Sequence, residues 1–445
     1  MKKIHKLSTL LVTSALGLVF LINPATGQTI QDLQVQINEL QQQLNNLEAQ
    51  LNEAQTEEKK SQENDFDIKW EPAPSIKSKD GRFEMNLRGR IYTDAGWVNN
   101  DVTSDKKATE FRAARLGIEG KAWNNVKYKF EIDFAGNAVT LKDAYVQIAG
   151  AGFKWTLGQH KTPNSLEEQT SSRYITFMER AAFTDAFGFA RQIGLGVGTG
   201  GDNWTVTFGA FRGNAGSSDM DEGTTLAGRA TWSPKLNNAN AKFHLGTSVR
   251  YRKIGDDQSL LRYRQRPFSH ITSDRFVNTG KEFEKDLLLG VEAAAVFGPF
   301  AIQSEYAWNW ASVPGESERF NFSGGYIEAS FYLTGESRAY DPKKGSFGRP
   351  KVKEPVFNGG MGAWQVAYRY DMIDLTNTIN LDGGGAWTIF GGQQNTHIIG
   401  INWWLNRYTR MMFNYSHSKI TKAFDVIESG ENQVDTFSIR AQVDW

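Results

Sequence analysis

Polar and apolar side chains alternate with a period of two along most of this chain, from Phe83 to the C-terminus. The first alternating segment shows the pattern in full. Its apolar positions are Phe83, Met85, Leu87, Ile91, Ala95 and Trp97, and its polar positions are Glu84, Asn86, Arg88, Arg90, Tyr92 and Asp94. Successive side chains of a β-strand point to opposite faces. The segment is therefore expected to be a strand with one apolar and one polar face.

Segments with this alternation recur about sixteen times, an even number, as in single-chain outer-membrane barrels. They lie near residues 83, 109, 125, 139, 153, 190, 203, 225, 242, 286, 300, 322, 361, 395, 409 and 433. Aromatic residues make up 12% of the chain, and many lie near strand ends, as the aromatic girdles of a membrane barrel require. A soluble β-sandwich would also alternate, but the strand length and the persistence of the pattern favour an all-β, 16-stranded antiparallel transmembrane β-barrel over residues 83–445.

The connections between these segments alternate in length. Trp123-Asn124-Asn125 and Asn406-Arg407-Tyr408 are short, whereas Gly255 to Asp286 and Thr334 to Gly360 are long and polar. Short turns of outer-membrane barrels face the periplasm. We therefore expect the two long connections on the opposite rim.

The last segment alternates up to the final residue. Phe437, Ile439, Ala441, Val443 and Trp445 share one face. An aromatic final residue on such a strand resembles the signal that the barrel assembly machinery reads, so this machinery and outer-membrane lipid are expected partners.

The N-terminus has the features of a secretory signal. Lys2, Lys3 and Lys6 precede an apolar run from Leu7 to Ile22, and small residues follow at Ala25-Thr26-Gly27. A membrane anchor would need a longer and more apolar run. We expect residues 1–27 to be a signal peptide that is removed on export.

A heptad repeat follows. Its apolar positions are Ile30, Leu33, Ile37, Leu40, Leu44, Leu47, Leu51 and Ala54, spaced alternately by three and four residues. The positions between them are mostly polar, so a helix over residues 28–60 is expected to bury this seam against other copies in a coiled coil. A lone amphipathic helix is the alternative. Residues 61–82 are polar, contain Pro72 and Pro74, and are expected to be a linker.

The amino-acid composition argues against several functional classes. The chain has 50 basic and 50 acidic residues, so no net charge favours nucleic acid as a partner, and it has no cysteine, so no lipoprotein anchor or disulfide can form. The histidines after the signal are His160, His244, His270, His397 and His417. They form no catalytic motif, so we expect no enzyme, and we expect no cofactor. Acidic pairs such as Asp221-Glu222 are typical of solvated loops rather than metal sites.

Several motifs together resemble the phosphate-selective porin O and P family, over almost the whole barrel. They are RAARLGIEG (112–120), Leu157-Gly158-Gln159, SLEEQTSSRYITFMER (165–180), GYIEASFYLTGESR (325–338), Gly362-Ala363-Trp364 with Arg369-Tyr370, Asp374-Leu375, and GINWWLN (400–406). The resemblance implies a trimer of sixteen-stranded barrels with an inward-folded third loop at about residues 161–187.

In that family the constriction loop offers hydroxyl groups and cations to a dehydrated anion. The matching positions here are Thr170, Ser171, Ser172, Arg173 and Arg180. Two positions depart from the family pattern. Ala113 stands where family members commonly have arginine, and Glu168 stands where they commonly have lysine. A carboxylate at a constriction repels multiply charged anions, so Glu168 favours a broader selectivity.

Strand parity independently places basic side chains on polar strand faces. These are Arg88, Arg90, Arg115, Lys121, Arg250, Arg252, Arg369 and Arg440. A guanidinium facing lipid at mid-depth costs about 2–4 kcal/mol, so these side chains should face the lumen. There they would form weak, exchangeable oxyanion sites.

The sequence thus predicts an outer-membrane porin that passes small hydrophilic solutes and prefers anions, with phosphate as one candidate, through an arginine-lined lumen. Two alternatives remain open. The chain could be a general porin, in which acids such as Glu84, Asp94 and Asp133 balance the arginines. It could also be a tether, in which the barrel anchors a coiled coil that contacts the cell wall.

Overall fold

The computed structural model describes residues 30–62, 66–101, 103–216, 221–234, 241–421 and 431–445. The predicted signal peptide lies outside these residues. The chain divides into two compact units, Met1–Asp65 and Phe66–Trp445.

The described part of the first unit is one helix, α2 (Ile30–Gln62). Its apolar seam is uncovered in the single chain, because the side chains from Ile30 to Leu51 in the heptad positions are all exposed, Ile30 by 84% and Leu33 by 47%. The helix itself agrees with the heptad prediction, and its pairing with other copies stays a prediction. In the described residues, no helix combines the length and the apolar character needed to cross a membrane.

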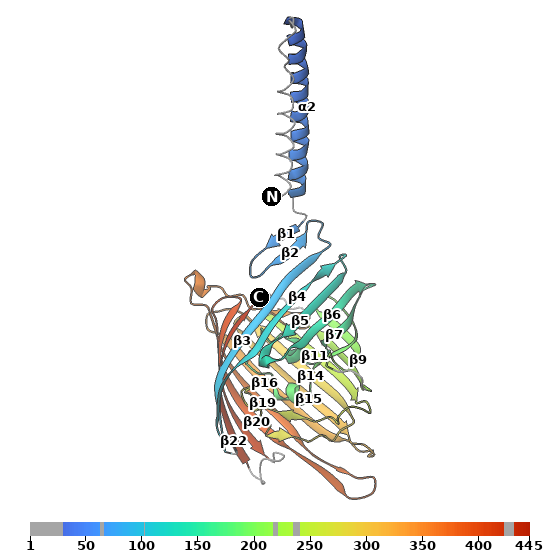
Figure 1. Cartoon of the computed structure of the whole chain (residues 1–445). Helices are drawn as coiled ribbons and strands as arrows, with labels where there is room; N and C mark the ends of the chain where they lie inside the picture. Colours follow the sequence, from blue (N-terminus) through green and yellow to red (C-terminus); the bar gives the residue numbers. More distant parts are fainter. Residues whose placement is uncertain (1–29, 63–65, 102, 217–220, 235–240, 422–430) are drawn as a thin grey trace. The chain divides into compact units, whose positions relative to one another are not determined.

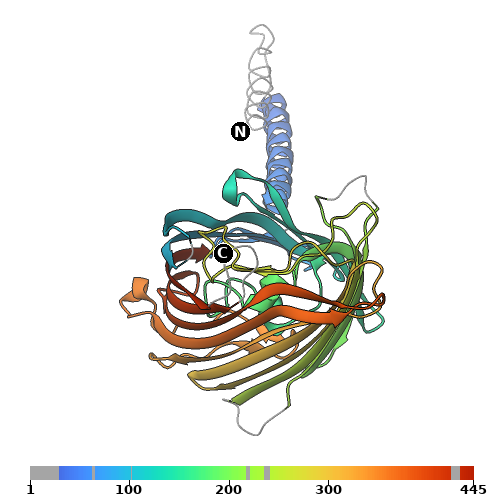
Figure 2. The same cartoon turned by 90° about the horizontal axis from the view of Figure 1, so that it is seen from below.

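The second unit is a closed antiparallel barrel of sixteen strands (Figures 1 and 2). The strands are β3 (Glu84–Asn100), β4 (Lys106–Ala122), β5 (Val126–Asp133), β6 (Thr140–Gly150), β7 (Phe153–Lys161), β8 (Arg191–Gly200), β9 (Trp204–Arg212), β10 (Thr224–Trp232), β11 (Ala241–Lys253), β14 (Lys285–Phe297), β15 (Phe300–Ser312), β16 (Phe320–Tyr332), β19 (Ala363–Asn380), β20 (Ala386–Trp404), β21 (Thr409–Thr421) and β22 (Glu431–Asp444). The last strand pairs with the first, from Val434 opposite Asn100 to Asp444 opposite Arg90. The predicted sixteen-stranded barrel is confirmed.

The alternation of the sequence becomes an inner and an outer face. On β3, Arg90 and Asp94 are 3% exposed inside the barrel, whereas Ile91 between them is 40% exposed outside. The apolar outer residues form the surface that a membrane barrel presents to lipid.

The segment expected to be a linker contains a hairpin. β1 (Phe66–Lys69) pairs with β2 (Ser75–Ser78), and β2 pairs with the start of β3, with Ser75 opposite Asn86. This stretch therefore extends the sheet at the rim where β3 begins. The prolines of this segment indicated a linker, but they do not show whether the residues around them pair with a neighbouring strand.

Three connections carry short elements of their own. The connection from β7 to β8 holds α3 (Leu166–Gln169) and α4 (Ala182–Ala186). The connection from β11 to β14 holds β12 (Arg264–Gln265) and β13 (Val277–Asn278), and the one from β16 to β19 holds β17 (Tyr340–Asp341), β18 (Ser346–Phe347) and η2 (Val356–Asn358). A further short turn, η1 (Ala135–Asn137), lies between β5 and β6.

The connection from Thr334 to Gly360 does not lie on the rim opposite the short turns, so this prediction is wrong. This connection joins β16 to β19 on the same rim as the short turn from β20 to β21, and Val356 N donates to Leu405 O at 2.8 Å in that turn. Strand direction reverses at every connection, so the rim of a connection follows from its place in the strand order and not from its length. The segment is long because it folds back into the barrel.

Candidate functional site

A cavity of about 1050 Å³ lies inside the barrel along the wall formed by β3 to β10. Its lining contains fifteen basic side chains and five acidic ones. The basic residues are Arg88, Arg90, Arg112, Arg115, Lys127, Lys129, Lys154, Lys161, Arg180, Arg191, Arg229, Arg266, Lys343, Lys344 and Arg440, and the acidic residues are Asp143, Glu168, Glu179, Asp185 and Asp202. Carboxylates outside the lining, among them Glu131 and Asp133, pair with several of these basic side chains.

The cavity follows this wall because β8 carries almost no inward side chains. Glycines occupy alternate positions there, among them Gly196, Gly198 and Gly200, and all three border the cavity. The opposite half of the barrel is filled. Phe183 and Phe187 of the β7–β8 connection and Tyr263 and Phe283 of the β11–β14 connection pack against inward residues of β14 to β22 in one buried apolar cluster.

The β7–β8 connection is held inside the barrel by polar contacts at both ends. Glu305 on β15 accepts from Leu166 N at 2.8 Å and from Glu167 N at 2.7 Å. Farther along, Arg440 on β22 donates to Met178 O at 2.9 Å. These anchors lie on strands across the barrel from β7, so the connection crosses the lumen and narrows it.

The first basic group of the lining surrounds Glu131. Arg88 Nε lies 3.1 Å, Arg90 Nη2 3.2 Å and Arg115 Nη1 3.3 Å from its carboxylate. Arg90 also donates to Ser172 Oγ at 2.8 Å, which ties the wall to the crossing connection. Three guanidinium groups therefore share one fully buried carboxylate.

Two further carboxylates contact these arginines. Glu119 pairs with Arg88, and Asp133 lies 2.8 Å from Arg115 Nε. Each arginine is thus fixed in place by carboxylates on neighbouring strands. A fixed guanidinium that keeps free N–H groups toward the cavity can offer hydrogen bonds to an oxyanion.

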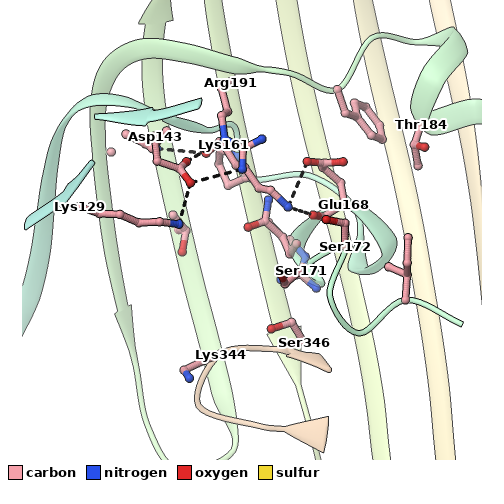
Figure 3. A pocket seen from close by; sticks show the side chains of 18 of the residues that line it. Lys129, Asp143, Lys161, Glu168, Ser171, Ser172, Thr184, Arg191, Lys344 and Ser346 are labelled. Atoms are coloured by element: carbon pink, nitrogen blue, oxygen red, sulfur yellow. Dashed lines mark hydrogen bonds and ion pairs between the residues drawn. The ribbon is translucent and has the colours of Figure 1, made fainter. Parts of the chain in front are cut away.

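The second basic group is built around Asp143 on β6. Lys129 Nζ lies 2.6 Å and Arg191 Nε 2.8 Å from its two oxygens. Figure 3 shows this group beside Lys161 and Glu168 on one side of the pocket, with Ser171 and Ser172 next to it.

The third group is Lys161, Glu168 and Arg180. Glu168 Oε1 lies 3.2 Å from Lys161 Nζ, and Oε2 lies 3.0 Å from Arg180 Nε. Burial alone would raise the pKa of Glu168, but Arg180 and Lys161 outweigh it and hold this pKa below its ordinary value. The carboxylate is therefore ionised and paired on both sides.

The fourth group joins Glu179 to Arg112 at 3.0 Å and to Arg440 at 3.3 Å. Burial again opposes ionisation, and the two arginines overcome it and lower the pKa of Glu179 to about 2. Arg440 also makes a two-pronged pair with Asp94, with both contacts at 2.7 Å. Ala113 follows Arg112 in the lining and offers no charge.

Four arginines lie on the β11–β14 connection, namely Arg262, Arg264, Arg266 and Arg275. The neighbouring acid is Asp185 on α4. Burial and the repulsion of the other arginines lower the pKa of Arg275 to about 10 despite this acid. Of these four arginines, Arg266 lines the cavity.

Six of the predicted site residues line the cavity, namely Arg88, Arg90, Arg115, Ser171, Ser172 and Arg180. The other six, Lys121, Thr170, Arg173, Arg250, Arg252 and Arg369, are not in its lining. Lys121 lies opposite Glu84 at the end of β4, and Arg173 lies 3.7 Å from Asp444.

The remaining four fasten inward segments. Arg250 and Arg252 share Asp286 at 3.1 and 2.5 Å, and Arg250 also donates to Phe187 O. Arg369 pairs with Glu167 at 2.9 Å and with Glu328 at 2.5 Å. Thr170 Oγ1 accepts from Phe347 N at 3.3 Å, so the two inward segments meet there.

Several lining cations were absent from the predicted site. Lys127 and Lys129 occupy the polar parity of β5, the same signal that selected Arg88 and Arg90 on β3. Arg112 falls next to an irregularity in strand pairing between Tyr92 and Thr93, which shifts the parity of β4. Lys343 and Lys344 come from an inward segment, and no strand pattern could have identified them.

Comparison with known proteins gives the relatives of this chain. The model of the family described as phosphate-selective porin O and P matches residues 85–445. An uncharacterised protein of Caulobacter vibrioides is 33% identical over 365 residues, 78% of this chain and 71% of that protein. Porin O of Pseudomonas aeruginosa is 25% identical over 412 residues, 85% of this chain and 92% of the porin.

Solved structures share the fold at much lower identity. A loop-deletion mutant of OmpT, an outer membrane protein of Vibrio cholerae, has a TM-score of 0.51 at 12% identity, covering 82% of this chain and 100% of the mutant. An anion-selective porin from Comamonas acidovorans has a TM-score of 0.51 at 13% identity, covering 81% of this chain and 99% of the porin.

Proposed function

The chain belongs to the phosphate-selective porin O and P family, and we propose that this porin of the bacterial outer membrane conducts small anions through the basic cavity of its barrel. The observation that carries the proposal is the lining, in which fifteen basic side chains face five acidic ones. Such a lining lowers the electrostatic energy of an anion along the lumen and raises that of a cation.

The arrangement of the pairs supports conduction rather than capture. The carboxylates Glu131, Asp143 and Glu168 are each shared by two or more cations. The Asp143 and Glu168 groups each hold one more cation than anion, whereas the three arginines around Glu131 are balanced by Glu131, Glu119 and Asp133. An anion therefore meets a series of weak sites, and flux requires sites that release the ion as readily as they bind it.

Phosphate preference belongs to the proposal as its finer part. Arg88, Arg90 and Arg115 are gathered at one place on the wall by their shared contact with Glu131, and Arg90 also contacts the hydroxyl group of Ser172. Forked guanidinium donors match phosphate oxygens better than chloride. Ala113 and Glu168 oppose this preference.

A general porin is the second candidate. The five lining acids and the uncharged Ala113 favour it. One experiment distinguishes the anion porin from the general porin. The reversal potential of the purified protein is measured in a planar bilayer under a potassium chloride gradient, and the chloride current is then titrated with inorganic phosphate. An anion-biased reversal potential with block of the chloride current by phosphate supports the proposal, whereas a neutral or cation-biased potential without block would leave a general porin.

We also propose self-association through α2, with a trimer as the expected state. The uncovered heptad seam supports it, because apolar side chains at these positions would be removed from water by a second helix packed along the seam. A role as a cell-wall tether would use the same helix. Deletion of residues 30–54 distinguishes the roles, since loss of envelope integrity with unchanged conductance would favour the tether.

A further inference from the structure

Glu168 faces the cavity with each of its two carboxylate oxygens occupied by a different cation. Lys161 comes from the end of β7 and lies 3.2 Å away, and Arg180 comes from the inward connection and lies 3.0 Å away. Figure 3 shows Lys161 and Glu168 pointing toward one another on the pocket wall. The position of Glu168 is set by α3, whose N-cap Ser165 accepts from Glu168 N at 3.2 Å.

Other N–H groups of Lys161 and Arg180 donate to the backbone of the β7–β8 connection. Lys161 Nζ donates to the carbonyl oxygen of Glu168, and Arg180 donates to the carbonyl oxygens of Glu167 and, at 2.9 Å, Thr170. These carbonyls belong to the short helix α3 and the residue after it. Most of the hydrogen-bonding capacity of both cations is therefore used inside the protein, although both side chains line the cavity.

We propose that Glu168 determines specificity by lowering the affinity of the constriction for multiply charged anions. With Lys161 protonated, the unit formed by Lys161, Glu168 and Arg180 carries one net positive charge instead of two, and most N–H groups of its cations contact the protein. This proposal rests on the anion conduction proposed above.

The effect depends on the charge of the ion. A fixed carboxylate repels a divalent anion twice as strongly as a monovalent one, so Glu168 reduces phosphate binding more than chloride binding. The neighbouring group around Asp143 still holds two cations against one carboxylate. The pore is thereby kept selective for anions while phosphate passes without being trapped.

The test is a charge series at this unit, measured as the phosphate concentration that halves the chloride current. Glu168→Gln raises the net charge of the unit to two, and the half-blocking concentration should fall about tenfold, the effect expected for one charge at close range in a partly hydrated lumen. The double variant Glu168→Gln with Lys161→Gln restores one net charge and should return the block to near the wild-type value. Glu318→Gln removes an exposed acid outside the cavity and should change nothing.

Assembly of each variant is checked by heat-modifiable migration in gels. If Glu168→Gln does not assemble, Lys161→Gln alone serves, because it lowers the net charge of the unit to zero and should weaken phosphate block about tenfold. If the wild-type pore is anion-selective but the half-blocking phosphate concentration is the same in all variants of the unit, the proposed role of Glu168 is wrong. A wild-type pore without anion preference would instead overturn the proposed function.

Discussion

Gly89 lies directly beneath the indole ring of Trp445, so that a Cβ atom on residue 89 would fall 2.2 Å from Cζ2 of that ring. The same residues are joined by their backbones, since Trp445 N donates to Gly89 O at 3.1 Å. The contact lies where β3 continues past the end of β22. The first and last barrel strands are therefore locked together by a ring that only a glycine can accommodate.

Substitution at residue 89 should weaken barrel closure. Gly89→Ala forces the indole ring to move, and overpacking of this kind costs about 1–3 kcal/mol. We expect the folded form to convert to the unfolded form at a lower temperature in heat-modifiability gels. Gly150→Ala is the matched control, because a Cβ on that strand glycine would meet nothing within 4 Å. Equal behaviour of the two variants would show that the contact does not contribute to closure.

Removal of Arg90 should reduce anion selectivity. Arg90 contacts both Glu131 and Ser172, so Arg90→Gln removes one cation from the wall and one link to the inward connection. We expect the anion-to-cation permeability ratio, taken from reversal potentials, to fall roughly threefold. Arg319→Gln removes an equal charge from an exposed loop and should leave the ratio unchanged. An unaltered ratio for Arg90→Gln would mean that other groups set the selectivity.

The barrel itself could be predicted from the sequence because its physics is local. A strand that faces lipid on one side and the lumen on the other must alternate, and Arg88 and Arg90 sit on the polar parity of β3 as expected. The same reasoning placed Arg250 and Arg369 inside the barrel. It could not show that Asp286 and Glu328 would bind them, because these acids lie on other strands, and their pairing depends on strand order and register.

The interior of the barrel was much less predictable. Parity says which side chains point inward, but not which inward space stays open. The cavity lies along β8 because its inward positions are glycines, and the far half is closed by aromatic residues of two connections, such as Phe187 and Tyr263. Contacts between segments distant in sequence, such as Thr170 with Phe347, leave no periodic signal.

The docking of the inward connection should resist mild acid. Glu179 has an ordinary pKa of 4.5, which falls to about 2 beside Arg112 and Arg440. A lowered folded-state pKa gives stability that is complete above the ordinary value and is lost as pH falls toward the lowered one. We expect the open-channel current to stay stable at pH 5 and to become unstable only between pH 4.5 and about 2, as the pairing of Glu179 is lost. Instability already near pH 6 would contradict this assignment.

The seam of α2 can be tested with cysteines, because the natural chain contains none. Leu44 is a seam position and Gln42 lies on the opposite face of the helix, although both side chains are exposed in the single chain. If α2 pairs with copies of itself, Leu44→Cys brings thiols from two chains within the short Cβ separation that a disulfide needs, whereas Gln42→Cys points them away. Mild oxidation of the full-length protein should therefore give a covalent dimer band in denaturing gels for Leu44→Cys and little for Gln42→Cys. Equal cross-linking of both variants would indicate random collision, and absence of cross-linking in both would mean that the seam is covered by something other than a second copy of this helix.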